Sequence, residues 1–260
     1  MREWIAVVCL GLIEGITEFL PVSSTGHLLL AEHWLAPQSD VFNTVVQSGA
    51  VLAVILTFAQ RLKQFAVQWR EPATQDYLIK LAAAFAITGA GGLILKKLQF
   101  KLPESVLPVA LATLIGGILF LLVERWLRNR TLSDAISWRI AVAAGAAQLL
   151  AAVFPGASRS GMTILAALVL GCSRPAATEF SFLLGIPTLL SAGALQAFSA
   201  LRHPAEQPEN WSMVLVGAAV GAVTAFAVVR WLIRFVQTHT FNVFAWYRIG
   251  LGLCMLWLVN

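Results

Sequence analysis

The sequence predicts an all-α polytopic membrane protein with six transmembrane helices, two re-entrant helix hairpins and an inverted-topology repeat. Three observations predict this fold. Hydrophobic residues make up 58% of the chain and charged residues only 12%, whereas soluble domains average about 25% charged residues. Six apolar stretches are long enough to cross a bilayer. Two other apolar stretches each end at a proline that polar residues follow, and these two proline motifs resemble each other.

The six predicted spans lie in a single membrane domain, residues 1–260. A transmembrane helix needs about 20 predominantly apolar residues to cross a hydrocarbon core of about 30 Å. Runs of this kind cover residues 41–60, 76–95, 105–124, 176–199, 213–233 and 244–259. Tryptophans near the ends of these runs are typical of the aromatic belts at the two membrane surfaces.

The two proline motifs are interpreted as the turns of re-entrant hairpins. Residues 3–19 and 140–154 form the first apolar halves, and the short apolar runs 28–35 and 162–171 form the second halves. Proline ends a helix because it lacks an N–H group and restricts the residue before it. Non-helical backbone inside a membrane is tolerated where it lines a polar cavity. Each hairpin is therefore expected to enter the membrane, turn and return to the same side.

The distribution of basic residues predicts the orientation. With both hairpins re-entrant, segments 61–75, 125–139, 171–175 and 230–243 share one side and contain ten basic residues. The opposite side contains five basic residues, which are Arg2, Lys96, Lys97, Lys101 and Arg202. Because basic loops stay in the cytoplasm, the side with ten is expected to be cytoplasmic, with both termini on the outer side of the membrane. The basic residues are scattered singly, which excludes a nucleic-acid partner.

The two proline motifs align at an offset of 134 residues, close to half the chain. "EGITEFLPVSS" begins at Glu14 and "QLLAAVFPGAS" begins at Gln148. At this offset the prolines and one serine of each motif coincide, as Pro21 with Pro155 and Ser24 with Ser158. The predicted hairpins enter from opposite sides, so the halves, approximately residues 1–130 and 131–260, are interpreted as inverted repeats.

An anion site is expected where the two motifs meet. Ser23 or Ser24, and Ser158, can cap the helices that follow the prolines, and the free N–H groups of two helix N-termini then attract an anion. Arg159 follows Ser158 in "PGASRSGMT" and offers a guanidinium that matches phosphate oxygens. No acid lies within several residues of Arg159, so its expected partner is an anionic substrate.

Ionisable residues of the first motif complete this cluster. Glu14 and Glu18 are one helical turn apart and share a helix face. Two close carboxylates repel unless a proton or a cation lies between them, and a divalent cation with oxygen ligands suits them. His27 can reach back within the first turn of its helix. Burying each charge in a membrane costs about 2.5–3.5 kcal/mol, so the cluster indicates a function rather than packing.

The stretches "EGITEFLPVSSTGH" and "FPGASRSGMT" resemble the undecaprenyl-diphosphate phosphatase family of bacterial inner-membrane enzymes, also called bacitracin-resistance proteins. Weaker support comes from "NTVVQSGAVLAV", "TEFSFLLGIPTLL" and "FAWYRIGLG", so the resemblance spans essentially the whole chain. It implies a hydrolase that removes the terminal phosphate of undecaprenyl diphosphate. The product, undecaprenyl phosphate, is the lipid carrier for peptidoglycan synthesis, and its recycling confers resistance to bacitracin.

The resemblance also implies roles for individual residues. The family's essential positions correspond to Glu14, Glu18, Ser24, His27 and Arg159, with a reaction that Mg²⁺ or Ca²⁺ at the two glutamates assists and a site that opens to the periplasm. Ser24 is the favoured nucleophile, with His27 as base or phosphate ligand, whereas attack by His27 or by a metal-bound water stays open. The residues expected to bind substrate are Arg159, Ser158, Ser160, Thr25, Ser23 and Thr163.

A membrane transporter or a flippase of the carrier lipid is the alternative function, because inverted repeats with broken helices are typical of transporters. The sequence breaks its own symmetry, however. At the offset of 134 residues, Ala152 matches Glu18 and Gly161 matches His27, and this division of groups between the halves favours catalysis. The expected partners are undecaprenyl diphosphate and membrane lipids, and a homodimer is left open.

Overall fold

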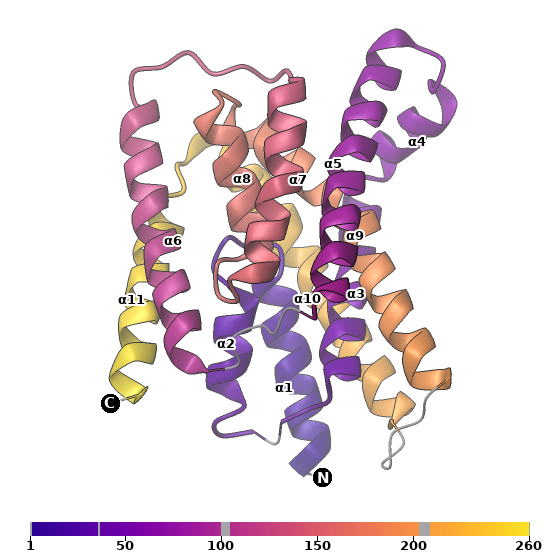
Figure 1. Cartoon of the computed structure of the whole chain (residues 1–260), viewed down its shortest axis with the longest axis vertical. Coiled ribbons are helices and arrows are strands. Elements are labelled where there is room, and N and C mark those ends of the chain that lie inside the picture. Colours follow the sequence, from indigo (N-terminus) through magenta and orange to yellow (C-terminus); the bar gives the residue numbers. More distant parts are fainter. Residues whose placement is uncertain (1, 36, 100–104, 203–208, 260) are drawn as a thin grey trace.

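The computed structural model describes residues 2–35, 37–99, 105–202 and 209–259. These residues form helices that run along the long axis of the molecule (Figure 1). In chain order the helices are α1 (Arg2–Thr17), α2 (Ser24–Ala31), α3 (Asp40–Thr57), α4 (Ala59–Val67), α5 (Pro72–Lys97), α6 (Val106–Leu127), α7 (Trp138–Val153), α8 (Arg159–Val169), α9 (Arg174–Arg202), α10 (Trp211–Thr238) and α11 (Asn242–Val259).

Among the described residues, five helices are long and apolar enough to cross a membrane, namely α3, α5, α6, α9 and α10. They cover five of the six predicted spans. The remaining predicted span, residues 244–259, falls on α11, a shorter apolar helix that packs along α6. The long helices expose large apolar side chains such as Leu122, Leu195 and Val223, as expected of surfaces that contact lipid tails rather than water.

Two pairs of short helices lie between the long ones. Helices α1 and α2 enter from the end of the molecule that holds the start of α1, and α7 and α8 enter from the opposite end (Figure 1). The loops of the two pairs approach each other near the middle of the molecule. The bounds of these helices agree with the predicted hairpin halves within a few residues. The proline motifs are therefore breaks between helices, as the sequence predicts.

Helix α1 is held deep in the bundle by close backbone contact with α10. A Cβ atom on Gly11 would lie 2.7 Å from the carbonyl oxygen of Gly217, and one on Gly15 would lie 2.5 Å from that of Gly221. The glycines are four residues apart on both helices, the spacing with which membrane helices approach each other most closely. This contact fixes the position of the helix that carries Glu14.

Helix α4 occupies residues that the sequence analysis assigned to a connecting segment. Helix α3 ends at Thr57, and after Phe58 the chain continues as α4. Phe65 of α4 is buried whereas Lys63 is exposed. The helix is therefore amphipathic. The sequence analysis did not predict it because its polar composition resembles that of a loop.

Candidate functional site

Each proline loop ends at a serine that caps the following helix. The hydroxyl of Ser23 accepts a hydrogen bond from the N–H of Gly26 at 3.2 Å, and that of Ser158 accepts one from Gly161 at 3.2 Å. Of the two serines that the sequence left open in the first motif, Ser23 is the cap. Both caps have positive φ angles, 73° and 71°. Non-glycine residues in such conformations cost about 1–3 kcal/mol and occur preferentially at functional sites.

The capping serines correct the alignment of the two motifs. Ser23 corresponds to Ser158, because both are caps with the same geometry, whereas the constant offset paired Ser24 with Ser158. The second loop has one more residue between its proline and its cap. Ser24 and Arg159 are therefore equivalent as the first residues of α2 and α8. The favoured nucleophile and the arginine occupy the same position in their helices.

Glu18, which follows the last residue of α1, connects Ser24 and Arg159. One carboxylate oxygen accepts a hydrogen bond from the hydroxyl of Ser24 at 3.0 Å. The other accepts from Nη2 of Arg159 at 3.1 Å, and the side chains of Glu18 and Arg159 are only 6% and 13% exposed. The sequence analysis expected Arg159 to have only the substrate as its anionic partner. The structure corrects this expectation, because the loop of the other half supplies a carboxylate.

Other polar side chains of the second motif tie the two loops together. The hydroxyl of Ser160 donates to the carbonyl oxygen of Leu20 at 3.0 Å, and it lies 3.2 Å from the hydroxyl of Ser158. Thr163 shares a hydrogen bond of 2.5 Å with Ser181 of α9. Ser160 and Thr163 are buried, so these two predicted substrate-binding residues already have partners inside the protein.

The first residues of α2 form the accessible side of the site. Thr25 is exposed, and Ser24, His27 and Ser158 are partly buried. Hydrogen bonds through Glu18 connect Ser24 with Arg159, whereas Thr25 forms no hydrogen bond with this cluster among the described residues.

His27 is on the same helix but bonds away from Ser24. Its Nδ1 lies 2.7 Å from the carbonyl oxygen of Ser23, and its Nε2 lies 2.6 Å from the hydroxyl of Tyr247 in α11. A carbonyl oxygen only accepts, so Nδ1 carries the proton, and in the neutral ring Nε2 accepts from Tyr247. The ring also stacks on Tyr247 with centroids 5.5 Å apart. His27 does reach back along its helix, but to Ser23 rather than to the Ser24 hydroxyl.

Glu14 lies one turn before Glu18 and is 1% exposed. Both of its carboxylate oxygens are buried without a hydrogen-bond partner among the described residues, although Glu18, Gln47 and Arg159 are close enough to interact with its charge. Buried polar atoms are nearly always satisfied, and an exception commonly marks an ion or a water. The described residues contain no cluster of three or more His, Cys, Asp or Glu side chains. The donor set thus comprises two carboxylates, which fits a cation that also binds substrate phosphates.

Arg248 is a functional candidate that the sequence analysis missed. It is 0% exposed, and it donates to five backbone carbonyl oxygens at 3.0–3.3 Å. Its acceptors belong to α6 and to both proline loops, namely Ala112, Thr113, Pro21, Gly156 and Ala157. Arg248 therefore fixes the two loops relative to each other. An arginine inside an apolar span was the available signal, because such residues are costly unless they have a function.

Gly185 of α9 makes room for the guanidinium of Arg159. A Cβ atom at Gly185 would lie 2.5 Å from Nη1 of Arg159. We expect Gly185→Ala to displace the guanidinium and to reduce catalytic efficiency at least tenfold, while alanine itself favours the helix. Gly92→Ala in α5 is the matched control, because nothing lies within 4 Å of its Cβ position. Equal activity of both variants would show that Arg159 does not need its present position.

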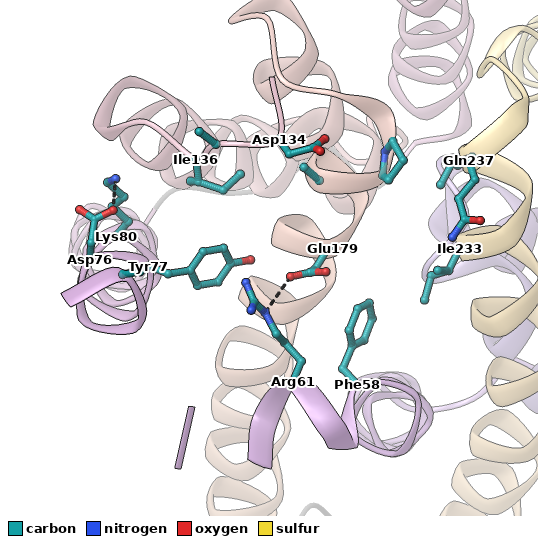
Figure 2. Close-up of a pocket in the computed structure, with 15 residues that line it drawn as sticks. Phe58, Arg61, Asp76, Tyr77, Lys80, Asp134, Ile136, Glu179, Ile233 and Gln237 are labelled. Atoms are coloured by element: carbon teal, nitrogen blue, oxygen red, sulfur yellow. Dashed lines mark hydrogen bonds and ion pairs between the residues drawn. The ribbon is translucent and has the colours of Figure 1, made fainter. Parts of the chain in front are cut away.

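A separate polar cavity of about 590 Å³ lies among α4, α5, α9 and α10. Figure 2 shows Arg61 and Glu179 in its lining with their side chains in contact, and they form an ion pair of 3.1 Å. The guanidinium of Arg61 also lies 5.0 Å from the ring centre of Tyr77. The cavity contains none of the site residues predicted from the sequence. The ion pair with Arg61 accounts for Glu179, which is a charged residue inside a predicted span.

Comparison with known proteins places the chain in a family. A profile of the family described as "Bacitracin resistance protein BacA" matches residues 7–254. A protein of Xylella fastidiosa named undecaprenyl-diphosphatase is 47% identical over 260 residues, which cover 99% of this chain and 100% of the relative. Proteins with the same name from Rhizobium etli and Xanthomonas axonopodis pv. citri are each 45% identical and cover 98% and 99% of the chain, with 96% and 98% of their own lengths matched. The chain therefore belongs to the bacitracin resistance protein BacA family.

Proposed function

We propose that this protein is an undecaprenyl-diphosphatase that hydrolyses undecaprenyl diphosphate to undecaprenyl phosphate and phosphate. Relatives with that name match the chain over nearly its full length. The observation that carries the proposal is the hydrogen-bonded chain from Ser24 through Glu18 to Arg159. It places a hydroxyl, a carboxylate and a guanidinium at the start of two helices, where a diphosphate is stabilised by positive dipoles. The enzyme name of the relatives gives the transporter alternative no support.

The two ends of the substrate require different surroundings. Arg159 and the N-termini of α2 and α8 suit the diphosphate. An apolar cavity of about 410 Å³ lies among α6, α7 and α8, and Met162, three residues after Arg159, is part of its lining. Such a cavity beside a cationic group fits the start of a prenyl chain, and the remainder of the chain extends into the lipid.

The contacts of Ser24 suggest how the anhydride is cleaved. A nucleophilic hydroxyl needs a base within hydrogen-bond distance, and the base needs a group that orients it. Glu18 is that base and Arg159 orients it, so in this proposal Glu18 takes over the role that the sequence analysis gave to His27. Ser24 Oγ attacks the terminal phosphorus, its proton moves to Glu18, and undecaprenyl phosphate leaves. Water then releases phosphate from the serine.

Glu14 and Glu18 would hold a divalent cation such as Mg²⁺ or Ca²⁺. Mg²⁺ is commonly bound by one or two carboxylates together with substrate phosphates, and the unpartnered oxygens of Glu14 fit this arrangement. When bound, the cation supplies positive charge that offsets the negative charge of the diphosphate. Further positive charge at the site comes from Arg159, and that of Arg248 lies behind the two loops.

The metal role of Glu14 is testable by Glu14→Gln. The change keeps the shape of the side chain and removes its charge, so we expect the activity to fall about tenfold or more and excess Mg²⁺ to restore part of it. Glu71→Gln, at an exposed position, is the matched control and should leave the metal dependence unchanged. The measurement is phosphate release as a function of Mg²⁺ concentration. An unchanged Mg²⁺ titration for Glu14→Gln would refute the metal role.

The activity itself is tested with the purified full chain in detergent. Undecaprenyl diphosphate is supplied, and both released phosphate and undecaprenyl phosphate are measured. The parent protein should form the two products in equal amounts, and Ser24→Ala should form neither above background while it unfolds at the same temperature. If the parent protein releases no phosphate from the prenyl diphosphate, the proposed function is wrong.

We further propose an inverted arrangement of two repeats, residues 1–130 and 131–260, with six spans and two re-entrant hairpins in a bacterial inner membrane. The opposite directions of α1–α2 and α7–α8 support it. The end of the molecule with fewer basic residues includes Lys97 and Arg202 and should face the periplasm together with the site, whereas Lys101 lies outside the described residues.

Labelling of single cysteines with a membrane-impermeant thiol reagent tests this orientation. The native thiols Cys9, Cys172 and Cys254 are free and are replaced first. A cysteine at Lys97 should react in intact spheroplasts, and a cysteine at Arg130 should react only after the membrane is opened. The reverse pattern would show that the orientation is inverted.

A further inference from the structure

A third cavity, of about 720 Å³, lies where the end of α6 meets the starts of α9 and α11. Its volume is within the range of about 300–1,000 Å³ that is typical of small-molecule sites. It is distant from the catalytic cluster, because α8, with 11 residues and a rise of about 1.5 Å per residue, separates Arg159 from the cavity end of the molecule. The ionisable residues that line this cavity are Glu124, Arg125, Arg128, Arg130 and Arg174.

The single carboxylate in the lining is already used inside the protein. Glu124 is buried, forms an ion pair with Arg174 and accepts hydrogen bonds from Nε of Arg174 at 2.9 and 3.1 Å. It also accepts from the N–H of Phe241 at 2.8 Å. Glu124 and Arg174 thus neutralise each other and build the wall of the cavity. The bonds from Arg174 and from the Phe241 N–H occupy both carboxylate oxygens of Glu124, so Glu124 does not neutralise another arginine.

Three positive charges therefore remain in the cavity. Among the described residues, no carboxylate lies within ion-pair distance of Arg125, Arg128 or Arg130. All three are exposed, and the guanidinium of Arg130 lies 3.7 Å from the ring centre of Trp126. Arg125 in the last turn of α6 also offsets the helix dipole. Arg128 is the C-cap residue of α6 and shares this role, whereas Arg130 lies beyond the helix and is not accounted for by the dipole.

The rest of the lining combines the polar residues Thr240 and Asn242 with apolar side chains. Leu121, Leu127 and Leu132 line the cavity together with Trp246, which is 63% exposed. Exposed tryptophans at the end of an apolar span are typical of the membrane surface. A free anion would contact only the arginines. A molecule with an anionic head and an apolar body would contact both the arginines and the leucines of the lining.

We propose that this cavity binds the phosphate headgroup of an anionic membrane phospholipid, with Arg125, Arg128 and Arg130 around the phosphate and an acyl chain against the leucines. Guanidinium groups bind phosphate oxygens in bidentate geometry, and basic pockets between helices at the membrane surface take lipid headgroups of this class. The site is independent of the phosphatase proposal, because it shares no residue with the catalytic cluster.

The test uses the purified full chain in detergent with three probes, which are phosphatidylglycerol, phosphatidylcholine and inorganic phosphate. Native mass spectrometry counts the retained lipid molecules, and lipid titration of the melting temperature gives an apparent Kd. The variant is Arg125→Gln/Arg128→Gln/Arg130→Gln. The matched control, Arg139→Gln/Arg230→Gln/Arg234→Gln, removes three exposed charges that lie outside the cavity. Arg128→Gln/Arg130→Gln leaves α6 intact if the triple variant does not fold.

The parent protein and the control should retain phosphatidylglycerol in preference to phosphatidylcholine, and inorganic phosphate should not raise the melting temperature. The triple variant should bind phosphatidylglycerol about a hundredfold more weakly and the double variant about thirtyfold more weakly. Unchanged lipid retention in the double variant would overturn the proposal. If the triple variant and the control lose the same amount of lipid binding, the proposal is overturned in favour of diffuse charge attraction. If inorganic phosphate raises the melting temperature as much as phosphatidylglycerol does, it is overturned in favour of a site for free anions.

Discussion

Arg159→Lys is expected to lower kcat/KM for undecaprenyl diphosphate by a factor that corresponds to roughly 2–4 kcal/mol of transition-state stabilisation, the loss typical of one oxyanion donor. The guanidinium now bonds Glu18 through Nη2 and lies 3.4 Å from the carbonyl oxygen of Ser181 through Nη1. Lysine keeps the charge but cannot hold Glu18 and a phosphate oxygen at once in the planar geometry of arginine. The loss should appear in kcat, because Glu18 loses the group that orients it toward Ser24.

Arg159→Ala should lower kcat/KM more than Arg159→Lys does, because both the buried Glu18 and the substrate phosphate then lose their cationic partner. The measurement is kcat and KM for both variants and the parent, with thermal unfolding as the folding control. Arg61→Lys is the matched control. Arg61 also pairs with a partly buried glutamate, but it lies in the polar cavity among α4, α5, α9 and α10. If the kcat/KM of Arg159→Lys equals that of the parent, Arg159 acts only as a diffuse positive charge. Its proposed role of holding Glu18 and a phosphate oxygen at once must then be abandoned.

Arg248→Met is expected to have the largest effect on stability. Methionine fits the apolar span but removes five hydrogen bonds to carbonyl oxygens of α6 and of the two proline loops. The Gly156 oxygen keeps a donor in Thr113 Oγ1 at 3.2 Å, whereas each loop carbonyl oxygen that loses its donor costs about 1–3 kcal/mol. At about 2–4 °C per kcal/mol for a chain of this size, the melting temperature should fall by roughly 10 °C or more.

Arg248→Lys separates the role of charge from that of geometry. Lysine has three donors on one nitrogen and cannot span five acceptors, so it should recover only part of the lost stability. Its kcat should fall more than its KM rises, because the loops that carry Ser24 and Arg159 lose their fixed relative position. Arg230→Lys, at an exposed position on α10, should change neither quantity. A melting temperature and kcat near those of the parent for Arg248→Lys would exclude a positioning role for the guanidinium.

Much of the fold is determined by local patterns that the sequence displays directly. An apolar run of about 20 residues has few alternatives to a membrane helix, and a proline ends a helix wherever it occurs. Five of the six predicted spans and the two helix breaks were therefore predictable. The cluster of Glu14, Glu18, Ser24 and Arg159 was also predictable, because ionisable groups inside apolar segments are costly unless they have a function. The same rule applied to "FAWYRIGLG" would have identified Arg248.

The sequence could not determine the partner of each side chain, because contacts between distant segments depend on how the helices pack. Glu18 and Arg159 are separated by 141 residues, and only the docking of one proline loop against the other brings them within 3.1 Å. The same docking decided that Ser23 rather than Ser24 is the cap, that Gly185 must lack a side chain and that His27 faces Tyr247. The sequence by itself determined which segments form apolar helices and which chemical groups they carry. The tertiary structure alone decided which groups meet, because ion pairs and hydrogen bonds require contact within about 3–4 Å, and no local pattern specifies that distance.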